Sequence, residues 1–271
     1  MTTVAKLLEF KKENVKELAS IIKALTFREI GKLSATPGGL RIVVGDGALQ
    51  QNIIKIMINS FPGNAYMETC FFSSFVCRDE TIEVNFPLKA LSECLNLGDA
   101  SSSSLSLSYA GFCEPLMLKI HDGNHSVKAK IHTLSSNETN DFNFEVSEIV
   151  ANCILKTTFL HDFFRDLDTT SPNLVIEVSE RELSFVTQGE IGMTTCTIPL
   201  KSLQMDVIAC SRPVTYGYRL SAIQRMTPAI GLSNRASLRI DNRGVLNLQL
   251  MIDHGDSLKS YIEFFVGFFF N

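Results

Sequence analysis

One pattern recurs four times along the 271 residues, and it constrains the fold more than any other feature. In each copy, a stretch of strand character leads directly into a segment whose apolar residues recur at helical spacing, and further strand-like stretches follow. The four predicted helices cover 15–25, 87–97, 158–167 and 220–226. Because two copies fall in each half, we expect two similar domains, each with two helices packed on antiparallel sheet.

Details within these segments give further expectations. Pro87 is predicted at the first helical position of its segment, where a missing N–H costs nothing. The third helix should turn its large apolar residues inward; these are Leu160, Phe163, Phe164 and Leu167.

The ends of the two halves share a hairpin pattern. The stretch 237–252, SLRIDNRGVLNLQLMI, alternates apolar and polar residues on both sides of a loop that contains Asn242 and Gly244. The stretch 116–131, LMLKIHDGNHSVKAKI, has the same rhythm as 248–264, LQLMIDHGDSLKSYIEF. The terminal hairpin is therefore one element of the repeat.

A polar stretch separates the halves. Residues 133–141, TLSSNETND, contain almost no large apolar side chains, which is typical of a connection. We therefore expect a first domain over 1–132, a connecting loop over 133–141 and a second domain over 142–271. Residues 53–58 of the first domain are strongly apolar.

Composition excludes several classes of protein. A formal net charge of −4 argues against a chain that binds nucleic acid with its whole surface, so any DNA contact should involve one face. Seven scattered cysteines without CxxC spacing indicate neither a zinc site nor a disulfide framework. No long apolar run or signal peptide pattern occurs, so we expect a soluble, intracellular protein.

Three stretches in register carry a resemblance to a known family: IIKALTFRE (21–29), NFPLKALSECLNL (85–97) and above all SLRIDNRGVLNLQLMI (237–252). The chain resembles the Rad-one subunits of the nine-one-one DNA-damage checkpoint clamp, a heterotrimeric relative of the replication clamp PCNA. The insertion at 47–63 and the aromatic end FFVGFFFN (264–271) depart from that family.

The resemblance implies an α+β fold of two tandem PCNA-like clamp domains, each with antiparallel sheet outside and two helices on the inner face. Such subunits form a ring that encircles DNA, and the helices line the hole. The cations expected to face double-stranded DNA, without sequence specificity, are Lys12, Lys16, Lys23, Lys89, Arg165 and Arg225. The alternative is that these are ordinary solvated side chains, since acidic residues share the same helices.

Assembly of the ring would use edge strands, which must pair or be protected. The resemblance implies that SVKAKIH of one subunit pairs with a strand of its neighbour, here GMTTCTI. The expected interface residues are Val127, Ala129, Ile131, Met193, Thr195 and Ile198. Alternatively, both strands are edges masked by polar side chains. On the first interpretation the isolated chain should be unstable or self-associating.

The connecting loop is where clamps bind partner peptides. Its expected docking residues are Thr133, Leu134, Asn137 and Asn140, although such a loop can equally be a simple connector. The implied partners are two other clamp subunits, a clamp loader, and checkpoint and repair proteins, with no membrane. The implied location is the nucleus, and neither cofactor nor metal is expected.

Two other functions stay open. The first is a homotrimeric replication-type clamp with the same fold. The second is a metal-dependent DNA exonuclease using Asp162, Asp166 and Asp168. No HExxH spacing, phosphate loop or GxSxG elbow supports an enzyme, and the spacing of Asp162 and Asp166 fits a solvated helix face.

Overall fold

The computed structural model describes residues 5–45, 61–98, 102–123, 125–135, 144, 146–190 and 192–269, which form two compact units. The first unit takes the described residues up to Gly45, those within 64–139, and 253–261. The second takes those within 46–63, 140–252 and 262–271. Both units are thus discontinuous in sequence, and the domain limits drawn at 133–141 stay a prediction. Most of the expected insertion, namely residues 47–60, lies outside the described residues.

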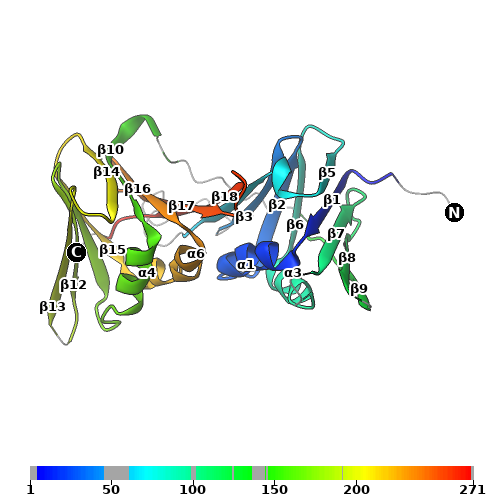
Figure 1. Cartoon of the computed structure of the whole chain (residues 1–271), viewed down its shortest axis with the longest axis horizontal. Helices are drawn as coiled ribbons and strands as arrows, with labels where there is room; N and C mark the ends of the chain where they lie inside the picture. The colour runs from blue at the N-terminus through cyan, green and yellow to red at the C-terminus, as the bar shows by residue number, and fades with distance from the viewer. Residues whose placement is uncertain are drawn as a thin grey trace. The chain divides into compact units, whose positions relative to one another are not determined.

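The first unit contains two sheets (Figure 1). One has the order β5 (Ser74–Cys77), β1 (Leu8–Glu13), β7 (Ser104–Tyr109), β8 (Leu116–Asp122) and β9 (His125–Ile131), and all its strand pairs are antiparallel. The other contains β4 (Gly63–Glu68), β3 (Gly39–Val44), β2 (Ile30–Thr36) and β6 (Ile82–Pro87). Helices α1 (Val15–Leu25) and α3 (Leu88–Leu95) pack against each other. A short 3-10 helix covers Thr69–Phe71.

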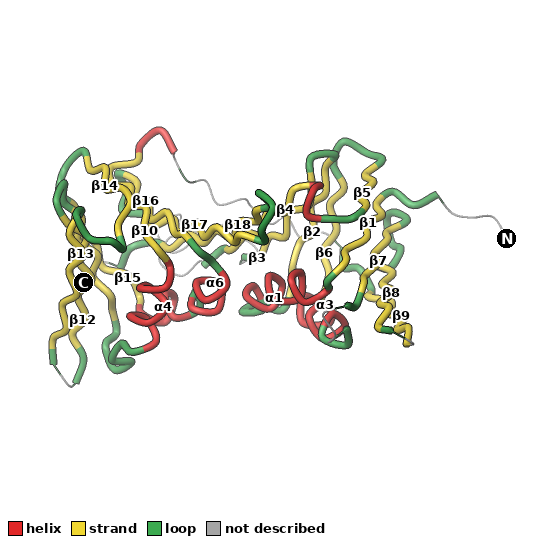
Figure 2. Tube along the Cα trace, in the orientation of Figure 1, coloured by secondary structure: helices red, strands yellow, loops and turns green. Residues whose placement is uncertain are grey.

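The second unit repeats this plan. One sheet has the order β14 (Met205–Cys210), β10 (Ile149–Lys156), β16 (Arg235–Asp241), β17 (Leu246–Asp253) and β18 (Lys259–Val266). The other has the order β13 (Met193–Pro199), β12 (Glu182–Gln188), β11 (Asn173–Val178) and β15 (Val214–Arg219). The helices are α4 (Thr157–Arg165), α5 (Leu220–Gln224) and α6 (Thr227–Leu232), and a 3-10 helix covers Val146–Glu148. Within each unit the α-helices lie on one side of the strands (Figure 2).

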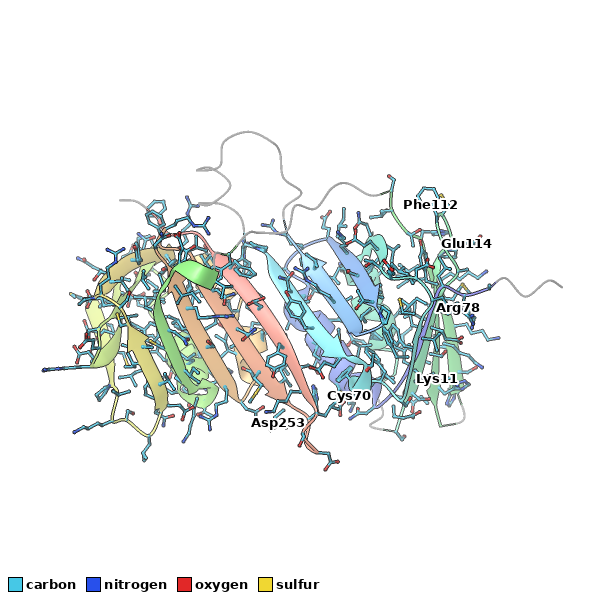
Figure 3. All side chains as sticks on the ribbon, turned by 90° about the horizontal axis from the view of Figure 1, so that it is seen from above. Lys11, Cys70, Arg78, Phe112, Glu114 and Asp253 are labelled. Atoms are coloured by element: carbon cyan, nitrogen blue, oxygen red, sulfur yellow. The ribbon has the colours of Figure 1, made fainter. Side chains whose placement is uncertain are left out.

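The passage from β1 into α1 shows how the sequence produces the step from strand to helix that each repeat contains. Leu8 and Phe10 of β1 are buried, whereas Lys11 is exposed on the outer side of the strand (Figure 3). Asn14 then adopts a left-handed conformation with φ 56°, which Asn tolerates better than most residues, and the chain turns into the helix. The apolar stripe of α1 is buried from Val15 to Leu25.

The predicted repeat is confirmed. Strands β1, β6, β10 and β15 each run directly into a helix, and the antiparallel sheets match the expected α+β architecture. The hairpin predicted in 237–252 is formed by β16 and β17, with Leu238 opposite Leu248. No helix in the described ranges is long and apolar enough to cross a membrane.

The structure corrects three local expectations. The predicted fourth helix, 220–226, is formed as α5 and ends at Gln224. A separate helix that was not predicted, α6, begins at Thr227, and Pro228 at its start cannot donate the backbone bond that a continuous helix needs. Pro87 is the last residue of β6 and caps α3 in an extended conformation, with ψ 108°, instead of being the first helical residue. Phe163 is only half-buried, unlike its neighbour Phe164.

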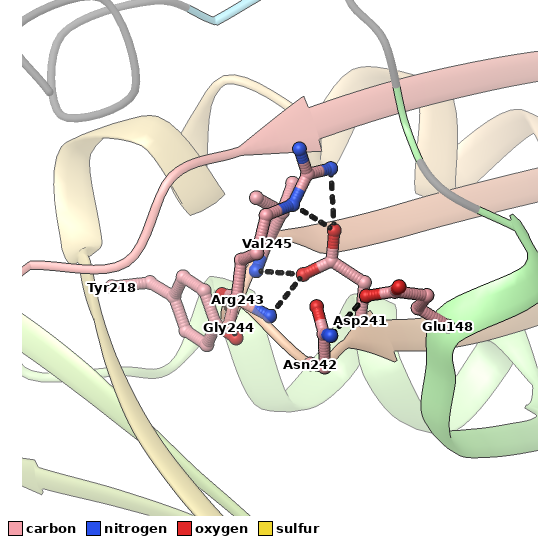
Figure 4. Close-up of polar contacts among 7 residues, drawn as sticks. All are labelled: Glu148, Tyr218, Asp241, Asn242, Arg243, Gly244 and Val245. Atoms are coloured by element: carbon pink, nitrogen blue, oxygen red, sulfur yellow. Dashed lines mark hydrogen bonds and ion pairs between the residues drawn. The ribbon is translucent and has the colours of Figure 1, made fainter. Parts of the chain in front are cut away.

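The turn of the β16–β17 hairpin is organised by one buried carboxylate (Figure 4). Asp241 is fully buried and accepts hydrogen bonds from the backbone N–H groups of Arg243 (3.0 Å) and Val245 (2.9 Å). The Arg243 guanidinium pairs with its other oxygen at 2.7 Å. These charge-assisted bonds offset the cost of burying the carboxylate.

Gly244 completes this turn. Its φ is +80°, and a Cβ there would lie 2.5 Å from the Tyr216 ring, so only glycine fits. The Gly244 carbonyl accepts a hydrogen bond from the buried Tyr218 hydroxyl at 3.0 Å, and burial raises the Tyr218 pKa well above its ordinary value. The run Asp-Asn-Arg-Gly is therefore a structural turn that ties β16 and β17 to β15.

Candidate DNA-facing helices and subunit edges

Three of the predicted DNA-facing lysines lie on the helices of the first unit. Lys16 and Lys23 are exposed on α1, away from its buried stripe, and Lys89 is exposed on α3. Because α1 packs against α3, these cations share one helical layer. The Lys89 ammonium lies 3.9 Å from a Glu93 carboxylate oxygen, and both side chains are largely exposed. An exposed pair at this distance contributes little to stability.

Lys12 does not share this position. It lies on β1 on the same side as Leu8 and Phe10, and its exposed fraction is 7%. Its ammonium group lies 2.6 Å from a Glu17 carboxylate oxygen and 3.9 Å from the centre of the Phe71 ring. The structure therefore does not support Lys12 as a DNA-facing residue, because strand alternation turns it into the unit.

The two arginines belong to the second unit. Arg165, in the last turn of α4, is exposed and pairs with Asp162 at 3.1 Å and with Asp166 at 3.0 Å. Hydrogen bonding from Arg165 lowers the pKa of Asp166. Arg225 follows α5, is exposed, and places its guanidinium 6.0 Å from the centre of the Phe61 ring. The helical layer of this unit thus presents mixed charge.

The two predicted interface strands are both terminal strands of their sheets. Strand β9 ends the order β5-β1-β7-β8-β9, and β13 ends the order β13-β12-β11-β15. Val127 and Ala129 are half-exposed, Thr195 is exposed, and Met193 has an exposed fraction of 68%. Ile131 and Ile198 are buried within their own units, with exposed fractions of 4% and 3%. The Ile131 and Ile198 side chains are therefore packed inside their own units, and only their backbone groups lie at the edge of a sheet.

A groove of about 500 Å³ lies beside β13. Its lining combines the half-buried rings of Phe159 and Phe163, stacked with centres 6.0 Å apart, with Asp162, Asp166 and Thr194. Thr194 belongs to the terminal strand β13, so this groove extends from the edge of the sheet to α4.

The start of the connecting loop is held to the first unit. The Thr133 hydroxyl donates to the Glu114 carbonyl at 3.1 Å, and Leu134 forms an isolated bridge with Asn85, with its N–H 2.8 Å from the Asn85 carbonyl. Leu134 remains exposed. The other two predicted docking residues, Asn137 and Asn140, lie outside the described residues.

The three carboxylates considered for catalysis have structural contacts. Asp162 and Asp166 pair with Arg165, while Asp168 accepts from the backbone N–H and the hydroxyl of Thr170, at 2.9 and 2.7 Å. Within the described residues, no group of three or more His, Cys, Asp or Glu side chains is placed to hold a metal ion. The arrangement resembles a loop-stabilising turn and a salt-bridged helix face.

Comparison with known proteins supplies the family. The model of the family described as "Repair protein Rad1/Rec1/Rad17" matches residues 7–252. The chain belongs to this Rad1 family.

Individual relatives agree over nearly the whole Rad1-family chain. It is 38% identical over 259 residues to the "Cell cycle checkpoint protein RAD1 homolog mrt-2" of Caenorhabditis elegans, covering 95% of this chain and 93% of that protein. It is 30% identical to the human "Cell cycle checkpoint protein RAD1", covering 93% and 88%. The "DNA damage checkpoint control protein rad1" of Schizosaccharomyces pombe is 20% identical, covering 94% and 85%. The two-unit, sheet-rich fold described above is that of PCNA-like clamp domains.

Sequence reasoning missed a buried polar cluster in the first unit of this Rad1-family chain. His254 packs against Phe71 with the rings tilted by 59° and their centres 5.0 Å apart, and its Nε2 lies 3.1 Å from the Ser260 hydroxyl. Its Nδ1 is 3.8 Å from the Glu17 carboxylate that pairs with Lys12. Burial lowers the His254 pKa despite this carboxylate. No local motif signals the cluster, since its members are far apart in sequence.

This lowered pKa predicts a specific pH dependence. The unfolded chain binds a proton at His254 more readily than the folded chain, so the stabilising effect of neutral His254 is full above the ordinary histidine pKa of about 6.5 and is lost as pH falls below it. Replacing His254 by Gln, which keeps a hydrogen-bonding group beside Ser260, should flatten this part of the profile. Urea unfolding between pH 7.5 and pH 5.5 measures it, and parallel profiles for the two proteins would contradict the assignment.

Proposed function

We propose that this chain is a non-catalytic subunit of a heterotrimeric ring clamp that encircles DNA at sites of damage. The ring serves as a platform for checkpoint signalling and repair proteins. The observation that carries the proposal is the family match over 7–252, together with relatives of similar length that are named as checkpoint proteins. Fold alone would not specify a function, because one fold supports many.

The edges of the two sheets support assembly. Within the described residues, β9 and β13 have a pairing partner on one side only. Unpaired backbone N–H and C=O groups on an exposed strand favour addition of another strand. Met193 and the aromatic groove beside β13 provide apolar surface that such a contact would cover. We therefore assign β9 and β13 to opposite sides of the contact between neighbouring subunits.

The helical layer supports a role in holding DNA without reading its sequence. Lys16, Lys23 and Lys89 are exposed on α1 and α3, and Arg225 is exposed beside α5. Their number is modest and carboxylates lie among them, so direct phosphate contacts would be weak. A ring retains DNA by topology, and for this purpose the cations need only offset electrostatic repulsion.

The remaining partners follow from this role. A closed ring requires a loader that opens it, and a platform requires docking surfaces, for which the exposed Leu134 at the start of the connecting loop is a candidate. Acting on chromosomal DNA would place the protein in the nucleus.

Two other functions share some of these features. A homotrimeric replication-type clamp has the same fold, but the named relatives are checkpoint proteins. A metal-dependent exonuclease would use Asp162, Asp166 and Asp168, whose described contacts are those of structural residues.

Edge substitutions test the assembly. Met193→Asp with Thr195→Asp places two charges on the exposed edge β13, where they should change the stability of the chain by less than about 1 kcal/mol. When the chain is co-expressed with the two other PCNA-like subunits of one organism, the wild type should form a complex whose mass contains one copy of each. The double variant should lose the contact made through β13. Size-exclusion chromatography with mass measurement reports both results.

The matched control is Thr215→Asp on β15, the other terminal strand of the same sheet, which should leave the complex intact. A stable complex for the double variant would remove β13 from the contact. A homotrimer formed by the wild-type chain alone would favour the replication-type clamp.

Charge reversal tests the DNA-facing helices. Lys16, Lys23, Lys89 and Arg225 changed together to Glu should reduce retention of the ring on circular DNA by about tenfold or more at low salt, because a favourable electrostatic term becomes unfavourable. The control reverses four exposed cations outside the helices: Arg78, Lys201, Arg212 and Lys259. Equal loss for the two sets would show that total charge, and not the helical layer, governs DNA retention.

A further inference from the structure

The outer face of the sheet β5-β1-β7-β8-β9 carries a row of lysines that no proposed role explains. Cross-strand pairing places Ser74, Lys11, Ser106, Lys119 and Lys128 in one line across the five strands. The three lysines are exposed, and Lys130 lies two residues further along β9 on the same face. We call these four lysines the outer lysine face.

The register gives this face an unfavourable contact. Lys119 and Lys128 are directly opposite each other in an antiparallel pair, where side chains lie about 5 Å apart at Cβ and like charges repel. Among the described residues, no ion pair is found for Lys11, Lys119, Lys128 or Lys130. A chain with a formal charge of −4 has thus gathered four cations without neutralising them.

The neighbouring outward positions are almost free of acid. On β7 they are serines, at 104, 106 and 108, and on β8 and β9 they are Met117, His121 and Ser126. Carboxylates appear only on β1, where Glu9 pairs with Lys6 at 2.8 Å and Glu13 lies opposite Ser104. The serine hydroxyls can donate to an anion that lies between the lysines.

We propose that the outer lysine face binds an extended, acidic segment of a partner protein. The row from Lys11 to Lys128 spans three strand spacings, about 14 Å, which matches the carboxylates of a peptide that lies across the strands. Exposed Val76 and Met117 lie in the next row, with Glu9 and Ser108 between them, and offer apolar contacts to such a peptide.

Nucleic acid fits this face less well. The outward positions carry no Phe, Tyr or Trp ring on which a base could stack. Duplex DNA is held by larger numbers of phosphate contacts, and Glu9 and Glu13 would repel a backbone laid along β1. The site is also separate from the backbone edge of β9, since a face uses side chains and an edge uses N–H and C=O groups. The proposal therefore does not depend on ring assembly.

The test combines stability with binding. Lys119→Glu converts the like-charge pair with Lys128 into an opposite-charge pair, so it should raise the thermal midpoint of unfolding. Lys11→Glu with Lys119→Glu should weaken binding of a fluorescein-labelled peptide of alternating Glu and Ser by about tenfold or more. Fluorescence anisotropy at low and moderate salt measures this on the full chain, alone or in the complex in which it purifies.

Three controls make the result decisive. Lys201→Glu with Arg212→Glu changes net charge equally and should leave binding unchanged, and a peptide of alternating Gln and Ser should not bind. A labelled DNA duplex should bind more weakly than the acidic peptide, with no loss from the Lys11 and Lys119 changes. A lower thermal midpoint for Lys119→Glu, no binding of the acidic peptide to the wild type, equal binding by the double variant, or a duplex that binds more tightly through the same lysines would each overturn the proposal.

Discussion

Burial of the apolar stripe of each helix against sheet is the constraint on which the rest of this structure depends. The α-helices in the described residues have between 5 and 11 residues, lengths at which an isolated helix is not stable in water. They exist because Val15, Leu18 and Ile22 in α1, and Leu160 and Phe164 in α4, are removed from solvent. This burial fixes which helix faces remain outside, and so determines where Lys16, Lys23 and Lys89 lie.

Packing helices against one face of a sheet does not pair the terminal strands of that sheet. Within the described part of the chain, β9 and β13 therefore have a strand neighbour on one side only. A chain with two such edges can close a ring if each edge meets the other kind on a neighbour. On this account, assembly completes the hydrogen bonding that folding of one chain leaves open.

Much of this could be predicted from the sequence because it depends on local periodicity. The limits of α1 follow from apolar residues at helical spacing, and the β16–β17 hairpin follows from alternation around Asn242 and Gly244. Helix α6 was not predicted, although Pro228, directly after the predicted helix 220–226, is typical of the first turn of a new helix. Strand β14 was not predicted, because MDVIAC at 205–210 shows no strict alternation of apolar and polar residues.

The candidate site residues also differ in how far the sequence could predict them. Lys12 was predicted among the DNA-facing residues of the helices. It lies on β1, on the same buried side as Leu8 and Phe10, so its side chain points into the unit. The cluster of Lys12, Glu17 and His254 joins residues from distant parts of the chain, and only the folded structure brings them together. The outer lysine face depends on strand register, which no single stretch of sequence specifies.

Hydrogen exchange of the backbone amides in β9 and β13 tests the central claim most directly, with the chain compared alone and in the assembled complex. The account predicts that assembly slows exchange in both terminal strands, while β15 and the interior strand β7 change little. Exchange rates in β9 and β13 that stay the same on assembly would contradict it, because the edges would then remain unpaired in the ring.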